Sequence, residues 1–92
     1  MTAAEVVQHV NLVLMDVYKD IDAYARYETR HKAELARYSS DTGYWHVTVR
    51  KTTQKQRLYS GLWRLDPAEQ TQTNIEYYLF EETTAQLTPT GN

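Results

Sequence analysis

The sequence contains no cysteine, only three glycines and two prolines, and no long run of apolar residues. The lack of cysteine excludes disulfide bonds, zinc–thiolate sites and thiol chemistry. Three glycines leave little material for a phosphate-binding loop, and no serine has the surroundings of a nucleophile elbow. No apolar stretch could span a bilayer, and the N-terminus lacks the basic region of a signal peptide. We therefore expect a soluble, cytoplasmic protein without a cofactor.

The formal net charge of −2 conceals an uneven distribution of charged residues along the 92-residue chain. The segment from Arg26 to Arg64 carries nine of the ten basic side chains, and no lysine or arginine follows it. Mutual neutralisation of the segments after folding would account for this pattern, and a basic functional face is the alternative.

The stretch from Thr2 to Tyr38 has no glycine or proline, and its apolar residues recur at steps of three and four. This spacing predicts one long helix with a heptad stripe. Thr2 followed by Glu5 fits a capping box, which predicts that the helix begins at Ala3. Glu28 interrupts the stripe, so the helix either continues or bends there, and the lack of a helix breaker favours continuity.

The rest of the chain predicts strands joined by polar turns. Period-two alternation and strand-favouring residues predict strands over Tyr44–Lys51, Arg57–Leu65 and Asn74–Glu82. The polar segment Thr52–Gln56 has the length of a hairpin connection, and Asp66–Glu69 has proline at the second position of a turn.

The predicted fold is α+β, with one long N-terminal helix followed by a three-stranded antiparallel meander. A single domain is expected over residues 1–82, followed by a disordered tail over residues 83–92. In its layout this α-β-β-β order resembles the helix and curled sheet of cystatin-like and PepSY modules. The resemblance implies, as one alternative, a small-ligand-binding module with a cavity between helix and sheet.

The predicted helix is much longer than the predicted strands. A helix of about 36 residues would extend roughly 54 Å, whereas a strand of about eight residues spans roughly 27 Å. The overhang would expose the apolar stripe, so we expect a homodimer through the N-terminal helix. A helix that bends near Glu28 and folds back on a monomeric core is the alternative.

Few residues are arranged for catalysis or metal binding. Glu28 and His31 have the Glu-x-x-His spacing of di-iron bundles, but those sites need a second motif and two more glutamates. His9, His31 and His46 have no ligand spacing between them. We therefore predict no metal site, no catalytic residues and no enzymatic activity.

The predicted sheet carries apolar residues on both faces. Ile75, Tyr77 and Leu79 point one way, whereas Tyr78 and Phe80 point the other. One helix covers one face, so the other must meet a second copy, a protein or a ligand.

The leading functional hypothesis is a small, non-enzymatic interaction or regulatory protein that binds or occludes a protein partner through an aromatic sheet face. Tyrosine, tryptophan and arginine dominate the energetics of protein interfaces. The predicted contacts are Tyr59, Trp63, Tyr78 and Arg57.

Nucleic-acid binding through the basic hairpin is the alternative, because phosphates pair with basic side chains and bases stack on aromatic ones. The sequence pI of about 5.9 is low for such a protein. The residues concerned are Arg50, Lys51, Lys55, Arg57 and Arg64.

Overall fold

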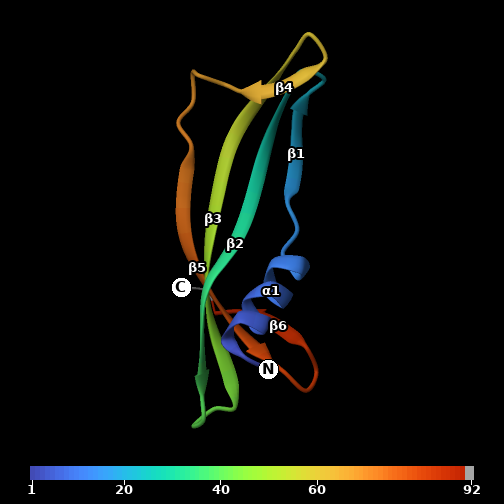
Figure 1. Ribbon diagram of the computed structural model, residues 1–92. Helices are drawn as coiled ribbons and strands as arrows, with labels where there is room; N and C mark the ends of the chain where they lie inside the picture. The colour runs from blue at the N-terminus through green and yellow to red at the C-terminus, as the bar shows by residue number, and fades with distance from the viewer. Residues whose placement is uncertain (91–92) are drawn as a thin grey trace.

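The computed structural model describes residues 1–90 and shows an elongated α+β protein with one N-terminal helix and an antiparallel sheet (Figure 1). Its principal extents are 52 × 21 × 19 Å. The elements are α1 (Ala3–Val13), β1 (Val17–Asp22), β2 (Ala25–Ser39), β3 (Tyr44–Tyr59), β4 (Leu62–Leu65), β5 (Gln72–Glu81) and β6 (Gln86–Pro89).

The sheet is built on the long hairpin of β2 and β3, which runs the length of the molecule (Figure 1). The strand order is β1-β2-β3-β5-β6, and β4 pairs with the last residues of β3. β5 pairs with the first part of β3, and β1 pairs only with the first part of β2. Within the described residues β1 is thus an edge strand.

The prediction of one helix over residues 2–38 is wrong beyond Val13. Its start is confirmed: the Glu5 N–H donates to Thr2 Oγ1 at 3.2 Å, and the Thr2 N–H donates to Glu5 Oε1 at 2.9 Å. The chain then forms β1 and β2, joined by a turn in which the Tyr24 N–H donates to Asp22 Oδ1 at 2.7 Å.

Long-range pairing explains this difference. β2 pairs with β3 from Ala25 opposite Arg57 to Ser39 opposite Tyr44, and helix propensity contains no information about such a partner. With 11 residues, α1 no longer overhangs the sheet. The length argument for a helix-mediated homodimer therefore has no basis in this fold.

The three-stranded meander is also wrong, because the sheet has six strands over residues 1–90. The predicted connection Thr52–Gln56 lies inside β3, so the strand predicted at Tyr44–Lys51 extends to Tyr59. The reversal comes at Ser60 and Gly61, whose φ angles of 51° and 80° suit a tight hairpin turn. This turn divides the strand predicted over Arg57–Leu65.

The last predicted strand, Asn74–Glu82, matches β5, and the turn after Asp66 is present. Residues 86–89, predicted to be part of a disordered tail, form β6 and pair with β5. The end of the predicted tail, residues 91–92, lies outside the described residues.

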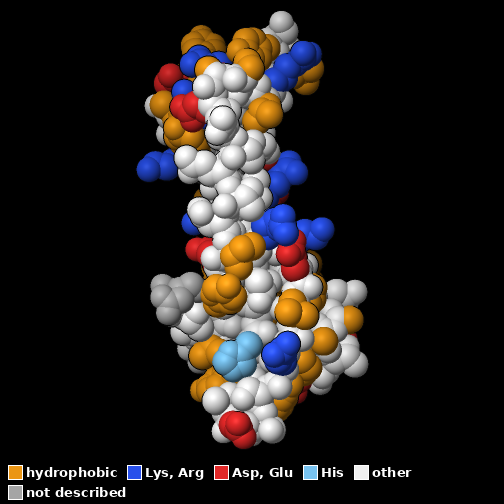
Figure 2. All heavy atoms as spheres, turned by 90° about the vertical axis from the view of Figure 1, so that its left-hand side faces the viewer, with side chains coloured by type: hydrophobic (Ala, Val, Ile, Leu, Met, Phe, Trp, Pro, Cys, Tyr) orange, Lys and Arg blue, Asp and Glu red, His pale blue; other side chains and the backbone are white. Residues whose placement is uncertain are grey.

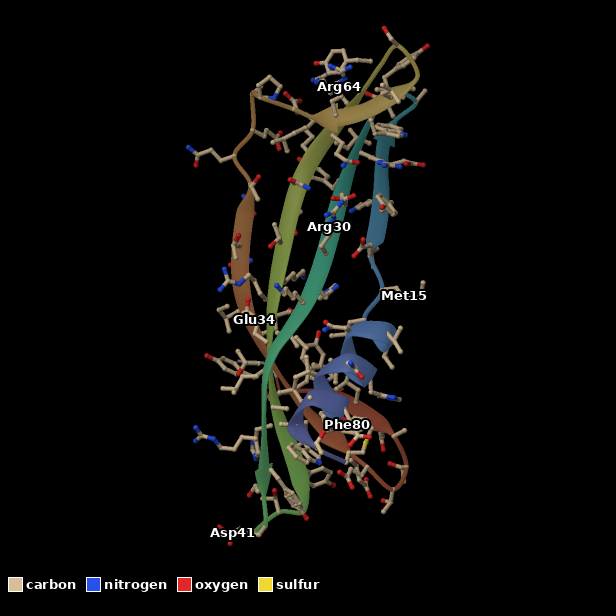
Figure 3. The ribbon with its side chains drawn as sticks, in the orientation of Figure 1. Met15, Arg30, Glu34, Asp41, Arg64 and Phe80 are labelled. Atoms are coloured by element: carbon tan, nitrogen blue, oxygen red, sulfur yellow. The ribbon has the colours of Figure 1, made fainter. Side chains whose placement is uncertain are left out.

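The core lies at one end of the sheet, where α1 packs on the strands. Val6 and Val10 of α1 are fully buried there. Figure 3 shows Phe80 beside the helix. The sheet side of the core consists of Ala33, Ala36, Trp45, Val47, Val49 and Phe80.

A bulge at Glu34 adapts β2 to the helix. The register shifts between Ala33 and Leu35, so that Ala33 and Ala36 both face α1 although they are three residues apart. The Ala33 N–H donates to Asn11 Oδ1 of α1 at 2.7 Å. The same shift turns Leu35 to the face of the sheet away from the helix.

In the part of the chain that the structure describes, residues 1–90, no helix combines the length and apolar character needed to cross a membrane.

Phe80→Ala should remove about 3–5 kcal/mol from the free energy of unfolding, because it leaves a cavity between α1 and β5. That is a large share of the roughly 5–15 kcal/mol typical of a domain. Urea denaturation followed by circular dichroism measures the change. Leu12→Ala is the control, because Leu12 is 78% exposed. Equal destabilisation by both variants would contradict this location of the core.

Candidate functional site

The end of the molecule away from the core brings two turns together, and we call this end the tip. The β1–β2 turn and the β3–β4 turn meet where the Leu58 N–H donates to the Tyr24 carbonyl oxygen at 2.8 Å. Figure 3 shows Arg64 at this end and Asp41 at the other. The tip exposes large apolar side chains that are 46–67% accessible: Ile21, Tyr24, Tyr59, Leu62 and Leu65.

A cation between two aromatic rings joins the two hairpins below the tip. The guanidinium carbon of Arg26 lies 4.3 Å from the centre of the Tyr18 ring and 4.1 Å from that of Trp63. The Arg26 Nε–H also donates to Gln56 Oε1 at 2.8 Å. This stack connects β1, β2 and β4, so it fixes their relative positions where no helix covers the sheet.

Glu28 is a buried carboxylate beneath this stack, with only 2% of the residue exposed. It accepts hydrogen bonds from Gln54 Nε2 at 2.9 Å and pairs with Arg30 Nε at 2.8 Å. Burial by itself would raise the pKa of Glu28, but these hydrogen bonds and the Arg30 charge outweigh it and lower the pKa. The carboxylate therefore stays ionised and structural.

Asp66 anchors the segment that leads from β4 to β5. Its carboxylate accepts from the Ala68 N–H at 2.9 Å and from the Arg57 Nε–H at 2.7 Å, and Lys55 Nζ lies 3.9 Å away. The backbone hydrogen bond from Ala68, followed by the hydrogen bond and charge of Arg57, lowers the pKa of Asp66. Arg57 is consequently engaged in holding this segment.

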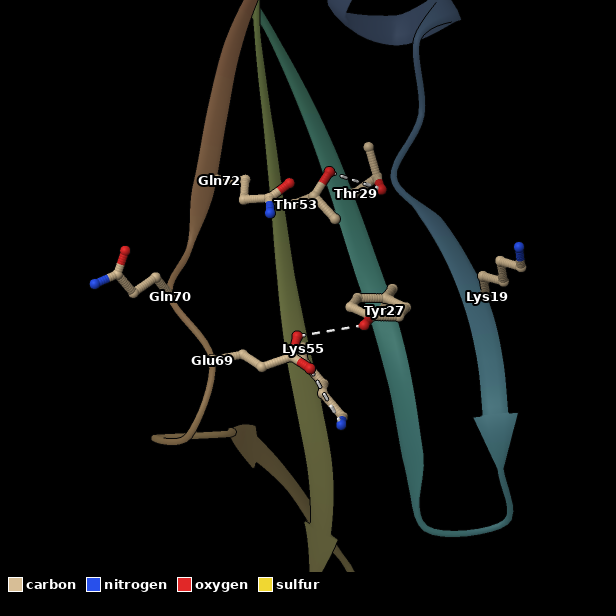
Figure 4. A pocket seen from close by; sticks show the side chains of 8 residues that line it. All are labelled: Lys19, Tyr27, Thr29, Thr53, Lys55, Glu69, Gln70 and Gln72. Carbon is tan, nitrogen blue, oxygen red and sulfur yellow. Dashed lines mark hydrogen bonds and ion pairs between the residues drawn. The ribbon is translucent and has the colours of Figure 1, made fainter.

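A polar hollow of about 350 Å³ lies beside the anchored segment (Figure 4). Lys55 Nζ lies 3.4 Å from Glu69 Oε1, and the Tyr27 hydroxyl donates to Glu69 Oε2 at 3.3 Å. The charges of Lys55 and Glu69 in this hollow are therefore paired with each other. Its lining consists of Lys19, Tyr27, Thr29, Thr53, Lys55, Glu69, Gln70 and Gln72.

Three of the four predicted partner contacts lie near the β3–β4 turn, but they do not share a face. Tyr59 and Arg57 are two residues apart on β3 and point to the same face, whereas the register with β4 points Trp63 to the other. Tyr78 lies at the other end, half-buried against the core, and its hydroxyl donates to Glu76 Oε1 at 3.2 Å. The aromatic residues therefore do not form one continuous sheet face.

The residues of the predicted basic surface are spread along β3 and β4, and most of their charges are neutralised by ion pairs. Arg50 Nε lies 2.7 Å from Glu34, and Lys51 Nζ lies 3.8 Å from Glu76. Lys55 and Arg57 both contact Asp66, so Arg64 is the only one of the five without an ion pair to residues 1–90. Successive residues of a strand also point to opposite faces. The five cations do not converge on one site.

Glu28 and His31 point to opposite faces of β2, because a spacing of three separates the faces of a strand. The Glu-x-x-His pattern therefore does not bring the two side chains together. Within residues 1–90 no group of three or more acidic or histidine side chains is arranged to hold a metal ion.

The contacts predicted from the sequence did not include Ile21, Tyr24, Leu62 or Leu65. Ile21 and Tyr24 lie in the stretch predicted to be helical, which gave no reason to place them at the same end as the β3–β4 turn. The available signal was Asp22, whose side chain favours a turn two residues on.

No family model, curated protein or solved structure matches this chain.

The free energy of unfolding should decrease at acidic pH, because Asp66 becomes protonated there. Since its folded-state pKa is lowered, the ionised carboxylate stabilises the fold above its unfolded pKa of about 3.9. That contribution is lost as pH falls through the lower folded value. Asp66→Asn should lower stability at neutral pH and flatten the acid dependence, measured by urea denaturation between about pH 2 and 7.

The control for this prediction is Asp41→Asn, in the exposed turn between β2 and β3, where the carboxylate makes no ion pair with residues 1–90. An unchanged acid dependence in Asp66→Asn would show that Asp66 does not anchor the segment.

Proposed function

We propose that the chain is a small, non-enzymatic protein-binding module that contacts or occludes a protein partner through the tip. The observation that carries the proposal is the group of exposed apolar side chains that two separate hairpins present at one end of the sheet. Exposed apolar patches of this kind mark interaction sites in soluble proteins.

The framework beneath the tip supports this function. The Arg26 stack connects β1, β2 and β4, and Asp66 fixes the segment after β4. A surface held in place before binding loses little conformational freedom when a partner docks, which favours affinity. The exposed tyrosines add rigid contact area with a polar end.

A protein partner fits these residues better than a nucleic acid. Besides its tyrosines the tip exposes Ile21, Leu62 and Leu65, which offer no ring surface for stacking bases. Arg57 is committed to Asp66, and the acidic residues Asp20 and Asp22 lie in β1 beside the tip. Electrostatic repulsion from carboxylates disfavours phosphates.

A paired variant tests the proposal. Affinity capture from the organism that encodes the chain identifies a bound protein, whose dissociation constant is then measured by calorimetry. Tyr24→Ser combined with Leu62→Ser should raise that constant by about thirty-fold or more, because truncation of a hot-spot side chain costs about 2 kcal/mol or more.

The matched control is Leu12→Ser with Val13→Ser, two exposed residues at the end of α1. Circular dichroism and urea denaturation should show that both double variants stay folded. Equal affinity of the tip variant and the native chain would overturn the proposal. A mobility shift of single- or double-stranded nucleic acid at low salt, abolished by Arg64→Ala, would favour the alternative.

A further inference from the structure

The sheet face opposite α1 carries a second apolar group, which we call the outer face. Its centre consists of Leu35, Ile75 and Tyr77, which are 43–55% exposed. Leu35 lies opposite Thr48, and Thr48 lies opposite Tyr77, so the centre extends across three adjacent strands. Figure 2 looks at this side and shows hydrophobic side chains gathered over the lower half, around a histidine and a basic side chain.

Two shallow hollows adjoin this centre. One of about 490 Å³ is lined from β2 to β5 and includes Leu35 and Arg37, and one of about 350 Å³ includes Leu79 and Thr90. His46, Thr48 and Tyr77 line both hollows. Together they make a groove across the strands that share these residues.

The three strands beneath the groove are together about as wide as one helix that lies along them. Neighbouring strands lie about 4.8 Å apart, so β2, β3 and β5 span about 10 Å between outer strand axes. An α-helix with its side chains is about 10–12 Å wide. Helix α1 contributes the two fully buried valines to the same three strands on the opposite face. A second helix on the outer face would complete a sheet covered on both sides.

The charges around the groove define the chemistry of such a helix. Lys32 and Arg37 are exposed on the outer face and make no ion pair with residues 1–90. Arg50, which lies between Lys32 and Ile75 in the sheet, is paired with Glu34 at 2.7 Å. An apolar centre with free cations at its rim is complementary to an apolar stripe flanked by carboxylates.

We propose that the outer face binds an amphipathic helix of a protein partner, whose apolar stripe is flanked by aspartate or glutamate. Face-to-face pairing of two copies would gather the free cations of both rims at one interface, which charge repulsion disfavours. Of the three residues at the centre only Tyr77 has a ring on which a base could stack, so successive nucleic-acid bases find no stacking platform there. The proposal does not depend on the tip, which lies at the other end of the molecule.

Three synthetic peptides test the proposal. Each has about 18 residues and the same leucine stripe, flanked by glutamate, by glutamine or by lysine. They are titrated into the ¹⁵N-labelled chain and followed by the amide signals. We expect the glutamate peptide to shift signals near Leu35, His46 and Tyr77, and to bind about ten-fold more tightly than the lysine peptide.

Charge reversal at the rim gives the discriminating result. Arg37→Glu should weaken the glutamate peptide about ten-fold and strengthen the lysine peptide. The control Lys19→Glu, an exposed cation on β1, should leave the order of affinities unchanged. The amide spectra of both variants also report whether they remain folded.

Equal affinity for the three peptides would overturn the proposal, as would shifts at Tyr24 and Leu62 in place of the outer face. A single-stranded oligonucleotide that shifts the outer-face signals at lower concentration than the glutamate peptide would likewise overturn it. The tip variant Tyr24→Ser with Leu62→Ser should bind the glutamate peptide with unchanged affinity. A failure of this proposal about the outer face is therefore distinguishable from a failure of the proposed function of the tip.

Discussion

The pairing of β2 with β3 is the constraint on which the rest of the molecule depends. This ladder continues from Ala25 opposite Arg57 to Ser39 opposite Tyr44, past the bulge at Glu34. Every other strand joins it directly or through β5, and α1 packs on its lower half. A single helix covers only one end of the sheet. At the other end the sheet is exposed to solvent on both faces, so contacts between side chains must stabilise it there. The Arg26 stack, the buried Glu28 and the Asp66 anchor all lie in that uncovered half.

The sequence predicted the parts of this fold that depend on neighbouring residues. The capping box of Thr2 and Glu5, the turn after Asp66 and the strand over residues 74–82 all have short-range signals, and each is present. The segment from Tyr27 to Ala33 shows the limit. Its only apolar residues are Tyr27 and Ala33, too few to establish a helical or a strand period, and only pairing with β3 decides between the two. The polar run Thr52–Gln56 resembles a connection when it is read alone. In the sheet it pairs with polar residues of the neighbouring strands, such as Thr29 and Thr73, and continues β3.

The candidate sites were predictable only in part, for the same reason. Tyr59, Trp63 and Arg57 were found from residue type, and they lie at one end because the Ser60–Gly61 turn folds β4 onto β3, although Trp63 points to the opposite face from the other two. Tyr24 and Ile21 required the β1–β2 hairpin, which the helical interpretation had removed. Arg50 and Lys55 looked like a basic surface along the sequence, but Glu34 and Asp66 reach them from strands or segments distant in the chain. The sequence alone does not show which charged residues will face each other across a sheet.

The edge strand β1 has a consequence for association between copies. Antiparallel pairing of two β1 strands about a two-fold axis places one residue opposite itself. If the axis passes through the middle of the strand, Lys19 meets Lys19 or Asp20 meets Asp20, and like charges opposite one another are destabilising. Like charges thus disfavour a dimer that pairs the otherwise open hydrogen-bonding edges of two β1 strands. Such a pairing would join only two copies, because it uses the same edge in both, and the charges at the middle of β1 oppose even that step.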